Sequence, residues 1–342
     1  MSTRRARVWI SQPFLDQDIA EVLGPYVEIV QAPAASAYTP EQLAAHLAGA
    51  DAAMVSLNER IGAAEVAGAP RLRVVANVGV GYNNLDIGAL TAAGVVATNT
   101  PDVLTETTAE LGFALLMATA RRIAEGDRLV RAGRWTGWSF TDLLGADLYR
   151  RTLGILGMGR IGQAIARRAA HGFDMPVLYH NRSRLPDAVE AEVGARYAGF
   201  DELLAQADHL VLVLPYTLAN HHLIDAAALA RMKPTATLVN IARGGIVDEL
   251  ALADALAHGR LAAAGLDVFE GEPKVRPELL ALDNVVLTPH IGSASLDTRR
   301  AMVRLAAQNI AAVLEFGAQP GRPPSAINAE AVKTGKTTIG KR

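Results

Sequence analysis

The sequence predicts an α/β fold of two parallel-sheet domains, in which a larger, doubly wound domain is inserted into a smaller one. First, short apolar runs alternate with helical stretches from residue 7 to residue 290, which is the βαβ order of parallel sheets. Second, residues 152–167 (TLGILGMGRIGQAIAR) combine an apolar run, a glycine-rich turn and a run of helix formers. Third, a long helical stretch at 295–316 follows the last predicted strand. Because this helix would return the chain to the first domain, we expect that domain to be discontinuous.

The composition is that of an ordinary globular protein. The chain has 342 residues, enough for about two domains, and half of its residues are apolar. A formal net charge of -2 gives no electrostatic support for binding nucleic acid or an anionic membrane. The absence of cysteine excludes disulfides and thiolate zinc sites, and it fits a cytoplasmic protein.

No targeting segment is expected. Polar residues and a proline at 12–16 interrupt the apolar run that follows the N-terminal arginines, so this segment is a poor signal peptide. No apolar stretch is long enough to span a bilayer. We therefore expect a cytoplasmic protein without a membrane partner.

The first domain contains continuous apolar runs bounded by turn residues, which are typical of buried parallel strands. Helices are predicted at 39–47, where Pro40 takes a tolerated first-turn position, and at 86–93. This domain has no phosphate-binding loop unless Gly79-Val80-Gly81 forms an anion cradle. The predicted strands are 8–10, 52–56, 72–78 and 95–99.

Between the domains, residues 105–132 are predicted to form one long helix with few breakers. The next segment, 133–149, is loop-like and contains Trp135, Trp138 and Phe140. These aromatic side chains either contact a partner surface or pack locally under the loop, and the sequence does not decide between the two.

The second domain opens with the glycine turn. Gly157 would make a tight turn, Gly159 would let a pyrophosphate approach the backbone, and Gly162 would let the helix pack against the strand. Phosphates would then lie at the positive end of that helix. The turn therefore predicts dinucleotide binding by a Rossmann-like domain. Its predicted strands are 152–156, 175–180, 209–214, 235–241, 262–268 and 285–288.

The domain borders follow from this pattern. We place the smaller domain at 1–103 with 291–325 and the larger one at 104–290. Proline, glycine and lysine dominate after residue 317, so a mobile tail is expected at 326–342.

The second strand of the glycine-turn unit indicates which dinucleotide binds. A site for NAD places an acidic residue at the tip of this strand, whereas here the tip reads Asn181-Arg182-Ser183-Arg184. Two guanidinium groups and a hydroxyl suit a 2′-phosphate, so we expect NADP(H), with NAD(H) possible. The alternative is that both arginines are solvated surface charges.

Polar side chains also follow three later strands. Arg243, Glu272 and His290 each come after a predicted strand of the parallel sheet, where ligands bind. Taken alone, each has a plain alternative: Arg243 could cap a helix or pair with Asp248, and a lone histidine such as His290 is more often structural than catalytic. Glu272 could be a turn residue, with Glu270 competing for its role. The adjacent His221 and His222 suggest surface histidines rather than a metal site, and no metal is expected.

Several ordered motifs then resemble one family. NVGVGYNNLD, NTPDVLTETTAE, ILGMGRIGQAIARR, NIARGGIVDE, AAGLDVFEGEP and LTPHIGSAS lie between about residues 75 and 310. The chain resembles the D-isomer-specific 2-hydroxyacid dehydrogenases, and within them the glyoxylate/hydroxypyruvate reductases. The resemblance implies a dinucleotide-binding domain inserted in a flavodoxin-like substrate domain. It also implies NADPH-dependent reduction of small 2-keto acids, such as glyoxylate and hydroxypyruvate, to glycolate and D-glycerate.

The resemblance further implies the site residues. His290 would protonate the carbonyl oxygen, Glu272 would favour the protonated form of His290, and Arg243 would hold the substrate carboxylate. Substrate contacts would come from a loop and from backbone N–H groups of the other domain, at Leu57, Asn58, Val80 and Gly81. Cofactor contacts would be Thr108, Gly157, Met158, Gly159, Arg160, Ile161, Gly162, Asn181, Arg182, Ser183, Leu214, Pro215, Ile241, Ala242 and Asp267.

Family members are usually homodimers. The resemblance implies that a segment at about 123–150 joins the protomers and that Trp138 reaches the partner's active site. The alternatives are a 2-ketogluconate reductase, another D-2-hydroxyacid dehydrogenase such as a 3-phosphoglycerate or formate dehydrogenase, and a dinucleotide-sensing corepressor. The strand tip at Asn181-Arg182 lacks the acid of most phosphoglycerate enzymes, and Glu272 stands where formate dehydrogenases have Gln.

Overall fold

The computed structural model describes residues 4–33 and 38–334, which fold into two units. One unit comprises residues 1–104 with 295–342, and the other comprises residues 105–294. The borders differ by one and by four residues from those expected at 103 and 290. Within the described part of the chain, no helix combines the length and apolar character needed to cross a membrane.

The first unit is built on a five-stranded parallel sheet with the order β2-β1-β3-β4-β5, which is the flavodoxin-like order. Strands β3 and β4 are buried along their whole length, as their continuous apolar runs require. The sheet contains β1 (Ala6–Ile10), β2 (Val27–Gln31), β3 (Ala52–Val55), β4 (Val74–Asn77) and β5 (Val96–Thr98). The sequence pattern missed β2, whose residues are mostly half-buried.

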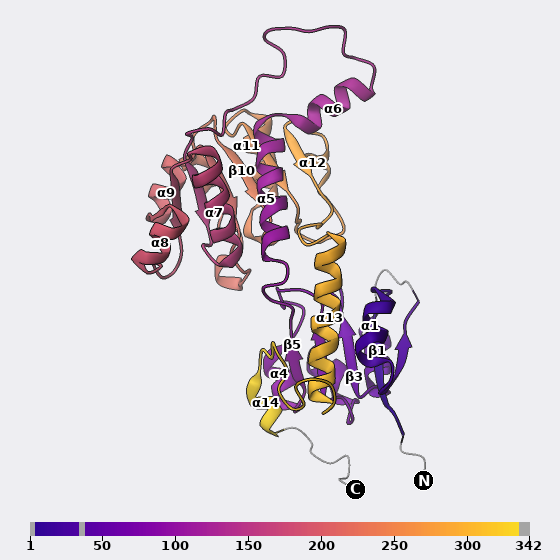
Figure 1. The fold of residues 1–342 in the computed structure, drawn as a ribbon. Helices are drawn as coiled ribbons and strands as arrows, with labels where there is room; N and C mark the ends of the chain where they lie inside the picture. Colours follow the sequence, from indigo (N-terminus) through magenta and orange to yellow (C-terminus); the bar gives the residue numbers. More distant parts are fainter. Residues whose placement is uncertain (1–3, 34–37, 335–342) are drawn as a thin grey trace. The chain divides into compact units, whose positions relative to one another are not determined.

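Helices of the first unit pack on this sheet, among them the long returning helix α13 (Leu296–Val313), which contacts β3, β4 and α1 (Figure 1). Arg304 of α13 donates to the buried Asp18 of α1 over 2.6 Å. Helix α2 begins with a capping box between Thr39 and Gln42, with Pro40 at its first position as expected. The helices are α1 (Asp16–Leu23), α2 (Pro40–Ala48), α3 (Ala63–Ala67), α4 (Ile87–Ala92), α13 and α14 (Ala329–Thr334).

The expectation of a mobile tail from residue 326 is wrong for residues 326–334. Ala326 pairs with Thr98 of β5, and Asn328 is 1% exposed. The Asn328 side chain accepts the Ala97 N–H over 2.7 Å and donates to the Val95 carbonyl over 3.0 Å. These long-range bonds to β5 hold the segment, although its composition alone resembles a tail. Residues 335–342 lie outside the described residues.

The second unit is built on a seven-stranded parallel sheet with the order β12-β11-β10-β9-β6-β7-β8. The order reverses between β6 and β9, so the predicted doubly wound, Rossmann-like fold is confirmed. The strands are β6 (Leu153–Leu156), β7 (Val177–His180), β8 (Ala195–Tyr197), β9 (His209–Leu212), β10 (Thr237–Asn240), β11 (Ala263–Leu266) and β12 (Val285–Leu287). The pattern missed β8, an edge strand of three residues.

Helices flank this second sheet. They are α5 (Thr105–Ala120), α6 (Ile123–Arg131), α7 (Arg160–Phe173), α8 (Asp187–Val193), α9 (Phe200–Gln206), α10 (Ala226–Arg231), α11 (Glu249–Ala257) and α12 (Pro277–Leu280). Two short 3₁₀ turns lie at Leu218–Asn220 and Gly244–Ile246.

The prediction of one helix over 105–132 is wrong, because the chain bends at Arg122. That residue has a left-handed φ of 53° and its guanidinium binds Glu125 over 2.7 Å, which separates α5 from α6. The segment after α6 contains no helix or strand (Figure 1). Within it Trp138 is 81% exposed and Phe140 82% exposed, so local burial does not account for either side chain.

Candidate active site

The glycine turn after β6 has the geometry that its sequence predicts. Gly157 has a φ of 102°, and a Cβ there would lie 2.7 Å from the Leu214 nitrogen. A Cβ on Gly162 would overlap the Gly157 carbonyl oxygen, so only glycine lets α7 pack this close. A Cβ on Gly159 would meet nothing within 4 Å, which leaves open space beside the backbone. The turn thus fits a pyrophosphate at the start of α7.

Asn181, at the tip of β7, also supports this turn. Its Oδ1 accepts the Met158 N–H over 2.7 Å. One of the N–H groups expected to contact the cofactor is therefore already bonded within the protein. Arg182 and Ser183 are exposed beside it, and Arg182 makes no hydrogen bond or ion pair to any residue that the structure describes.

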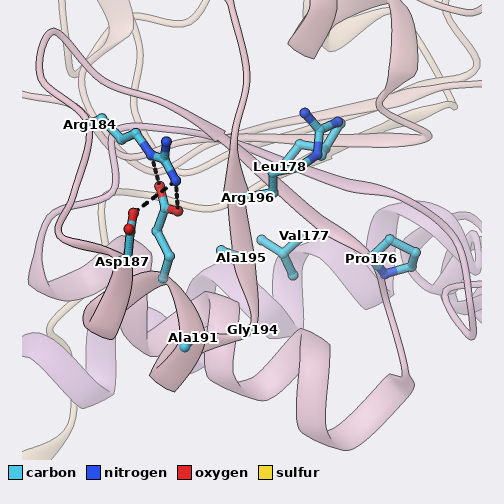
Figure 2. A pocket seen from close by; sticks show the side chains of 10 residues that line it. Pro176, Val177, Leu178, Arg184, Asp187, Ala191, Gly194, Ala195 and Arg196 are labelled. Atoms are coloured by element: carbon cyan, nitrogen blue, oxygen red, sulfur yellow. Dashed lines mark hydrogen bonds and ion pairs between the residues drawn. The ribbon is translucent and has the colours of Figure 1, made fainter.

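Arg184 is not available for a 2′-phosphate, contrary to the sequence interpretation. Its guanidinium binds Glu190 over 2.7 Å and Asp187 over 3.0 Å (Figure 2). Glu190 also accepts the Tyr179 hydroxyl over 2.6 Å. The hydrogen bonds from Arg184 and Tyr179 lower the pKa of Glu190 to about 2, while burial and the Glu190 contact raise the pKa of Tyr179 to about 12. Arg184 therefore stabilises the β7–α8 connection.

A pocket of about 530 Å³ lies beside this connection, and Figure 2 shows the side chains that line it. It is lined by residues of β7, α8 and β8, including Leu178 and Arg196, and by Pro176, which directly precedes β7. None of Arg243, Glu272 and His290 lines it. The pocket is therefore separate from the expected catalytic residues.

Arg243 lies in a tight turn after β10. The Asn240 side chain accepts the Ala242 N–H over 3.0 Å and donates to the Arg243 carbonyl over 2.9 Å, which folds the turn. A Cβ on Gly244 would overlap the Phe269 backbone, so glycine lets this turn touch the loop after β11. The sequence interpretation missed Asn240, although an Asn at a strand end followed by a turn is a recognisable signal.

The Arg243 side chain is half-buried, and its Nη1 donates to the Ala242 carbonyl over 2.7 Å. Burial lowers the pKa of Arg243, which the charge of Glu272 partly offsets. Nε and Nη2 have no hydrogen-bond partner among the described residues. Arg243 thus presents a partly desolvated cation, of the kind that binds a carboxylate.

Asp267 holds the turn that carries His290. Its Oδ1 accepts the Thr288 hydroxyl over 2.7 Å and the Ile291 N–H over 2.8 Å, and its Oδ2 accepts the Gly292 N–H over 2.9 Å. Burial raises the pKa of Asp267, against the effect of these hydrogen bonds. We expected a cofactor contact here; the structure assigns the Asp267 carboxylate a supporting role within the protein.

Glu272 and His290 form the expected pair. Glu272 Oε2 lies 2.8 Å from His290 Nδ1, and Glu272 Oε1 accepts the Phe269 N–H over 2.9 Å. Burial by itself raises the pKa of Glu272, but the contact with His290 and the Phe269 N–H bring it below its ordinary value. The charge of Arg243 acts in the same direction. Glu272 is therefore ionised beside the imidazole.

Glu270, the possible competitor, faces a different histidine. Its Oε2 lies 3.1 Å from His222 Nε2, and His221 Nε2 lies 4.0 Å from Oε1. The ligand atoms of these three side chains fall within 4.8 Å of one another, a grouping that the sequence reading of plain surface histidines did not foresee. Arg276 Nη2 lies 3.6 Å from Glu270 Oε2, so a cation already faces this carboxylate.

The other expected cofactor residues line the carboxyl edge of the same sheet. Leu214 follows β9 and abuts Gly157, while Ile241 and Ala242 follow β10 and are buried. Thr108 of α5 is buried, and a Cβ on Gly292 would lie 3.4 Å from its methyl group. Pro215 accepts the Asn220 side-chain amide over 2.8 Å. The sheet therefore brings together residues that are far apart in sequence.

The expected substrate residues of the first unit also converge. A Cβ on Gly79 would lie 2.8 Å from Leu57, so the 79–81 loop approaches the 57–58 loop closely. The Asn77 side chain donates to the Gly81 carbonyl over 2.9 Å, and that of Asn99 donates to the Val80 carbonyl over 2.8 Å. The N–H of Asn58 donates to the Ser56 hydroxyl over 3.2 Å. Both loops are thus held by side chains of their own unit.

Comparison with known proteins agrees with this architecture. The profile of the family described as D-isomer specific 2-hydroxyacid dehydrogenase, NAD binding domain, matches residues 113–292. The glyoxylate reductase of Thermococcus onnurineus is 51% identical over 290 residues, which are 84% of this chain and 85% of that protein. A crystal structure from Thermus thermophilus has a TM-score of 0.86 at 39% identity and covers 94% of this chain and 99% of its own.

A further solved structure contains ligands. It is an NADPH-dependent glyoxylate/hydroxypyruvate reductase from Sinorhizobium meliloti in complex with NADP and malonate. The two chains are similar with a TM-score of 0.82 at 33% identity, covering 95% of this chain and 97% of the other.

Proposed function

Because the chain belongs to the D-isomer specific 2-hydroxyacid dehydrogenase family, we propose that it reduces glyoxylate and hydroxypyruvate to glycolate and D-glycerate with NADPH. The observation that carries the proposal is the 2.8 Å contact of Glu272 with His290, at the sheet edge that also holds the partly buried Arg243 and the glycine turn. Relatives named glyoxylate reductase and glyoxylate/hydroxypyruvate reductase support the choice of substrate.

The proposed proton transfer and substrate binding use the atoms of His290 and Arg243 that no group of the described residues occupies. Glu272 occupies His290 Nδ1, so Nε2 is the ring atom that delivers a proton to the substrate carbonyl oxygen. Arg243 binds the substrate carboxylate through its guanidinium fork and orients the keto group. The hydride taken up by the carbonyl carbon would come from a bound nicotinamide, held by the glycine-turn unit. The negative charge of Glu272 stabilises the imidazolium before the proton leaves.

The two units take the roles implied by the resemblance. The second unit, residues 105–294, binds the dinucleotide through the glycine turn. In the first unit, Leu57, Asn58 and the backbone N–H groups of Val80 and Gly81 bind the substrate. The glycine turn of the second unit and the converging loops of the first unit support this assignment.

Turnover of a substrate panel tests the proposal. NADPH oxidation is followed with glyoxylate, hydroxypyruvate, pyruvate and 2-ketogluconate, and each assay is repeated with NADH. Fast turnover of the first two substrates with NADPH is expected. Turnover of 2-ketogluconate alone would keep the mechanism but contradict the substrate. Tight NADPH binding without any turnover would contradict the enzyme assignment and favour a dinucleotide-sensing protein.

The preference for NADPH rests on Arg182. This exposed guanidinium has no partner among the described residues, and no acidic residue stands at the strand tip. Loss of one charge-assisted contact costs about 1.5–3 kcal/mol, so Arg182→Ala should weaken NADPH binding by about 10- to 100-fold and NADH binding far less. Fluorescence titration of both cofactors measures this effect. Arg184→Ala is the control, because Arg184 is tied to Glu190; equal losses for both cofactors in Arg182→Ala would contradict the preference.

We also propose that segment 123–150 joins two protomers and that Trp138 reaches the partner's substrate site. Exposed apolar side chains support this: Ile123, Val130, Leu144 and Tyr149 are each more than half exposed, and Trp138 contacts only Phe140 among aromatic rings of the described chain. Trp138→Ala should change the glyoxylate-to-hydroxypyruvate ratio of kcat/KM more than it changes the cofactor Kd. Phe140→Ala is the matched control, and an unchanged substrate ratio in Trp138→Ala would contradict the proposal.

A further inference from the structure

A buried carboxylate lies behind the Glu270–Glu272 loop, outside the expected reaction site. Glu249 is the first residue of α11, and it is 2% exposed. Its Oε1 accepts the backbone N–H of Glu270 over 2.6 Å, across 21 residues of sequence. This short bond ties the start of α11 to the loop that carries the glutamate facing His290.

Arg276 completes the contact from the far end of the same loop. Its Nε lies 3.5 Å from Glu249 Oε2, and its Nη2 lies 3.6 Å from Glu270 Oε2. The Glu249 Oε2 and Arg276 Nε atoms are buried, and neither makes a hydrogen bond to a described residue. Charge attraction alone holds Glu249 Oε2 to Arg276, so loss of Arg276 would leave the buried Glu249 carboxylate without its cation.

The backbone links this pair to Glu272. Two consecutive N–H groups of the loop each donate to a carboxylate: that of Glu270 to Glu249 and that of Phe269 to Glu272. These two hydrogen bonds therefore hold the backbone on both sides of Phe269. Gly271, with a φ of 83°, then turns the chain so that Glu270 faces His222 and Glu272 faces His290.

We propose that Glu249, together with Arg276, is a positioning residue that holds Glu272 against His290 and keeps Glu270 turned toward His222. The inference rests on the proposed function, because it gives Glu249 a role in the proton transfer assigned to His290. Among the described residues, no hydrogen bond or ion pair joins Glu249 to His290 or to Arg243, so Glu249 acts through the loop rather than on the substrate.

Charged groups around Glu249 agree with this arrangement. Burial raises the pKa of Glu249, and the charges of Glu270 and Glu272 add to the rise. The Glu270 N–H and Arg276 act in the opposite direction and favour the carboxylate. Without Arg276, the Glu249 carboxylate would face the charges of Glu270 and Glu272 with no cation beside it.

Kinetics of Glu249→Ala provide the first test. The whole general-acid contribution is about 10²–10⁴-fold, so misplacing Glu272 should lower kcat/KM for glyoxylate by about 10- to 100-fold. Cofactor Kd should stay within about twofold of the wild-type value, since the glycine turn is unchanged.

Two further variants separate positioning from folding. Glu249→Gln keeps an oxygen that accepts the Glu270 N–H, and it should recover most of the activity lost in Glu249→Ala. Asp254→Ala, on the exposed face of the same helix, removes a carboxylate that pairs with Arg260 and His258, and it should leave kcat/KM unchanged. If Glu249→Ala leaves kcat/KM at the wild-type value, or if Glu249→Gln loses as much activity as Glu249→Ala, the proposal is overturned.

Amide hydrogen exchange gives a readout that does not need turnover. In Glu249→Ala the N–H groups of Glu270 and Phe269 should both exchange faster, whereas the Ile291 N–H, which Asp267 binds, should not change. Faster exchange at Glu270 alone would show that Glu249 does not control Glu272 and would overturn the proposal. A wild-type protein that turns over no keto acid would contradict the proposed function, while the exchange result still tests the positioning of the loop.

Discussion

Two glutamates of the same loop each contact a histidine, and the two pairs have similar contact distances and similar side-chain exposure. Glu272 meets His290 at 2.8 Å and Glu270 meets His222 at 3.1 Å. The side-chain exposures are 34% and 31% in the first pair and 29% and 33% in the second. Contact distance and burial therefore do not distinguish the two pairs.

The groups beside each pair differ. Near Glu272 lies Arg243, half-buried and with part of its guanidinium unbonded, and His290 sits on a turn fixed by Asp267. Near Glu270 lie Arg276 and the ring of His221, which stacks on His222 at 3.8 Å. Arg243, beside the first pair, has guanidinium nitrogens available for a substrate carboxylate. Arg276, beside the second pair, already faces the carboxylates of Glu249 and Glu270. The two pairs therefore differ in whether the neighbouring arginine has unbonded nitrogens that can bind a ligand.

The largest difference should appear when the two histidines are replaced. Removal of a general acid costs about 10²–10⁴-fold, so His290→Gln should lower kcat for glyoxylate by that amount. His222→Gln removes only a partner of Glu270 and should lower kcat less than tenfold. Steady-state kinetics with saturating NADPH measure both variants. Equal losses of kcat in the two variants would contradict the expected difference between the two histidines.

A smaller difference is expected between the two glutamates. Glu272→Gln leaves His290 without an anionic partner and should lower kcat/KM by about 10- to 100-fold, a part of the general-acid contribution. Glu270→Gln breaks the contacts to His222 and Arg276 and should cost about 1–3 kcal/mol of stability, with kcat/KM within a few-fold of wild type. Thermal unfolding and kinetics of the same preparations separate the two effects. A Glu270→Gln variant that loses activity without losing stability would assign Glu270 to the reaction.

The smallest expected effect is that of pH on kcat/KM through Glu272. The fold lowers the pKa of Glu272. Above the ordinary glutamate value of about 4.3 the side chain is therefore ionised, and the stability and activity that depend on its charge are fully present. They are lost only as pH falls through the lowered pKa. The kcat/KM profile at constant ionic strength should therefore show no acidic limb from Glu272 between about pH 5 and 7. An acidic limb in that range that vanishes in Glu272→Gln would contradict this assignment.

Much of this site was predictable because its residues occupy positions fixed by local chain geometry. Parallel strands end at one edge of the sheet, so Arg243, Glu272 and His290 were expected together once their strands were recognised. Asn240, Glu249 and Arg276 were not expected, because their roles depend on contacts that no local pattern encodes. Glu249 and Glu270 are 21 residues apart, and each looks like an ordinary helix or loop residue in the sequence.

The sequence by itself determined the α/β class, the glycine turn and the three strand-end loops, because apolar periodicity and glycine conformations are local properties of the chain. Only the tertiary structure decided that Arg184 is bound to Glu190, that the chain turns at Arg122 and that residues 326–334 pack against β5. It also decided which glutamate faces which histidine. These outcomes depend on hydrogen bonds and charge pairs between distant segments, and such pairs form only when the sheets bring their partners together.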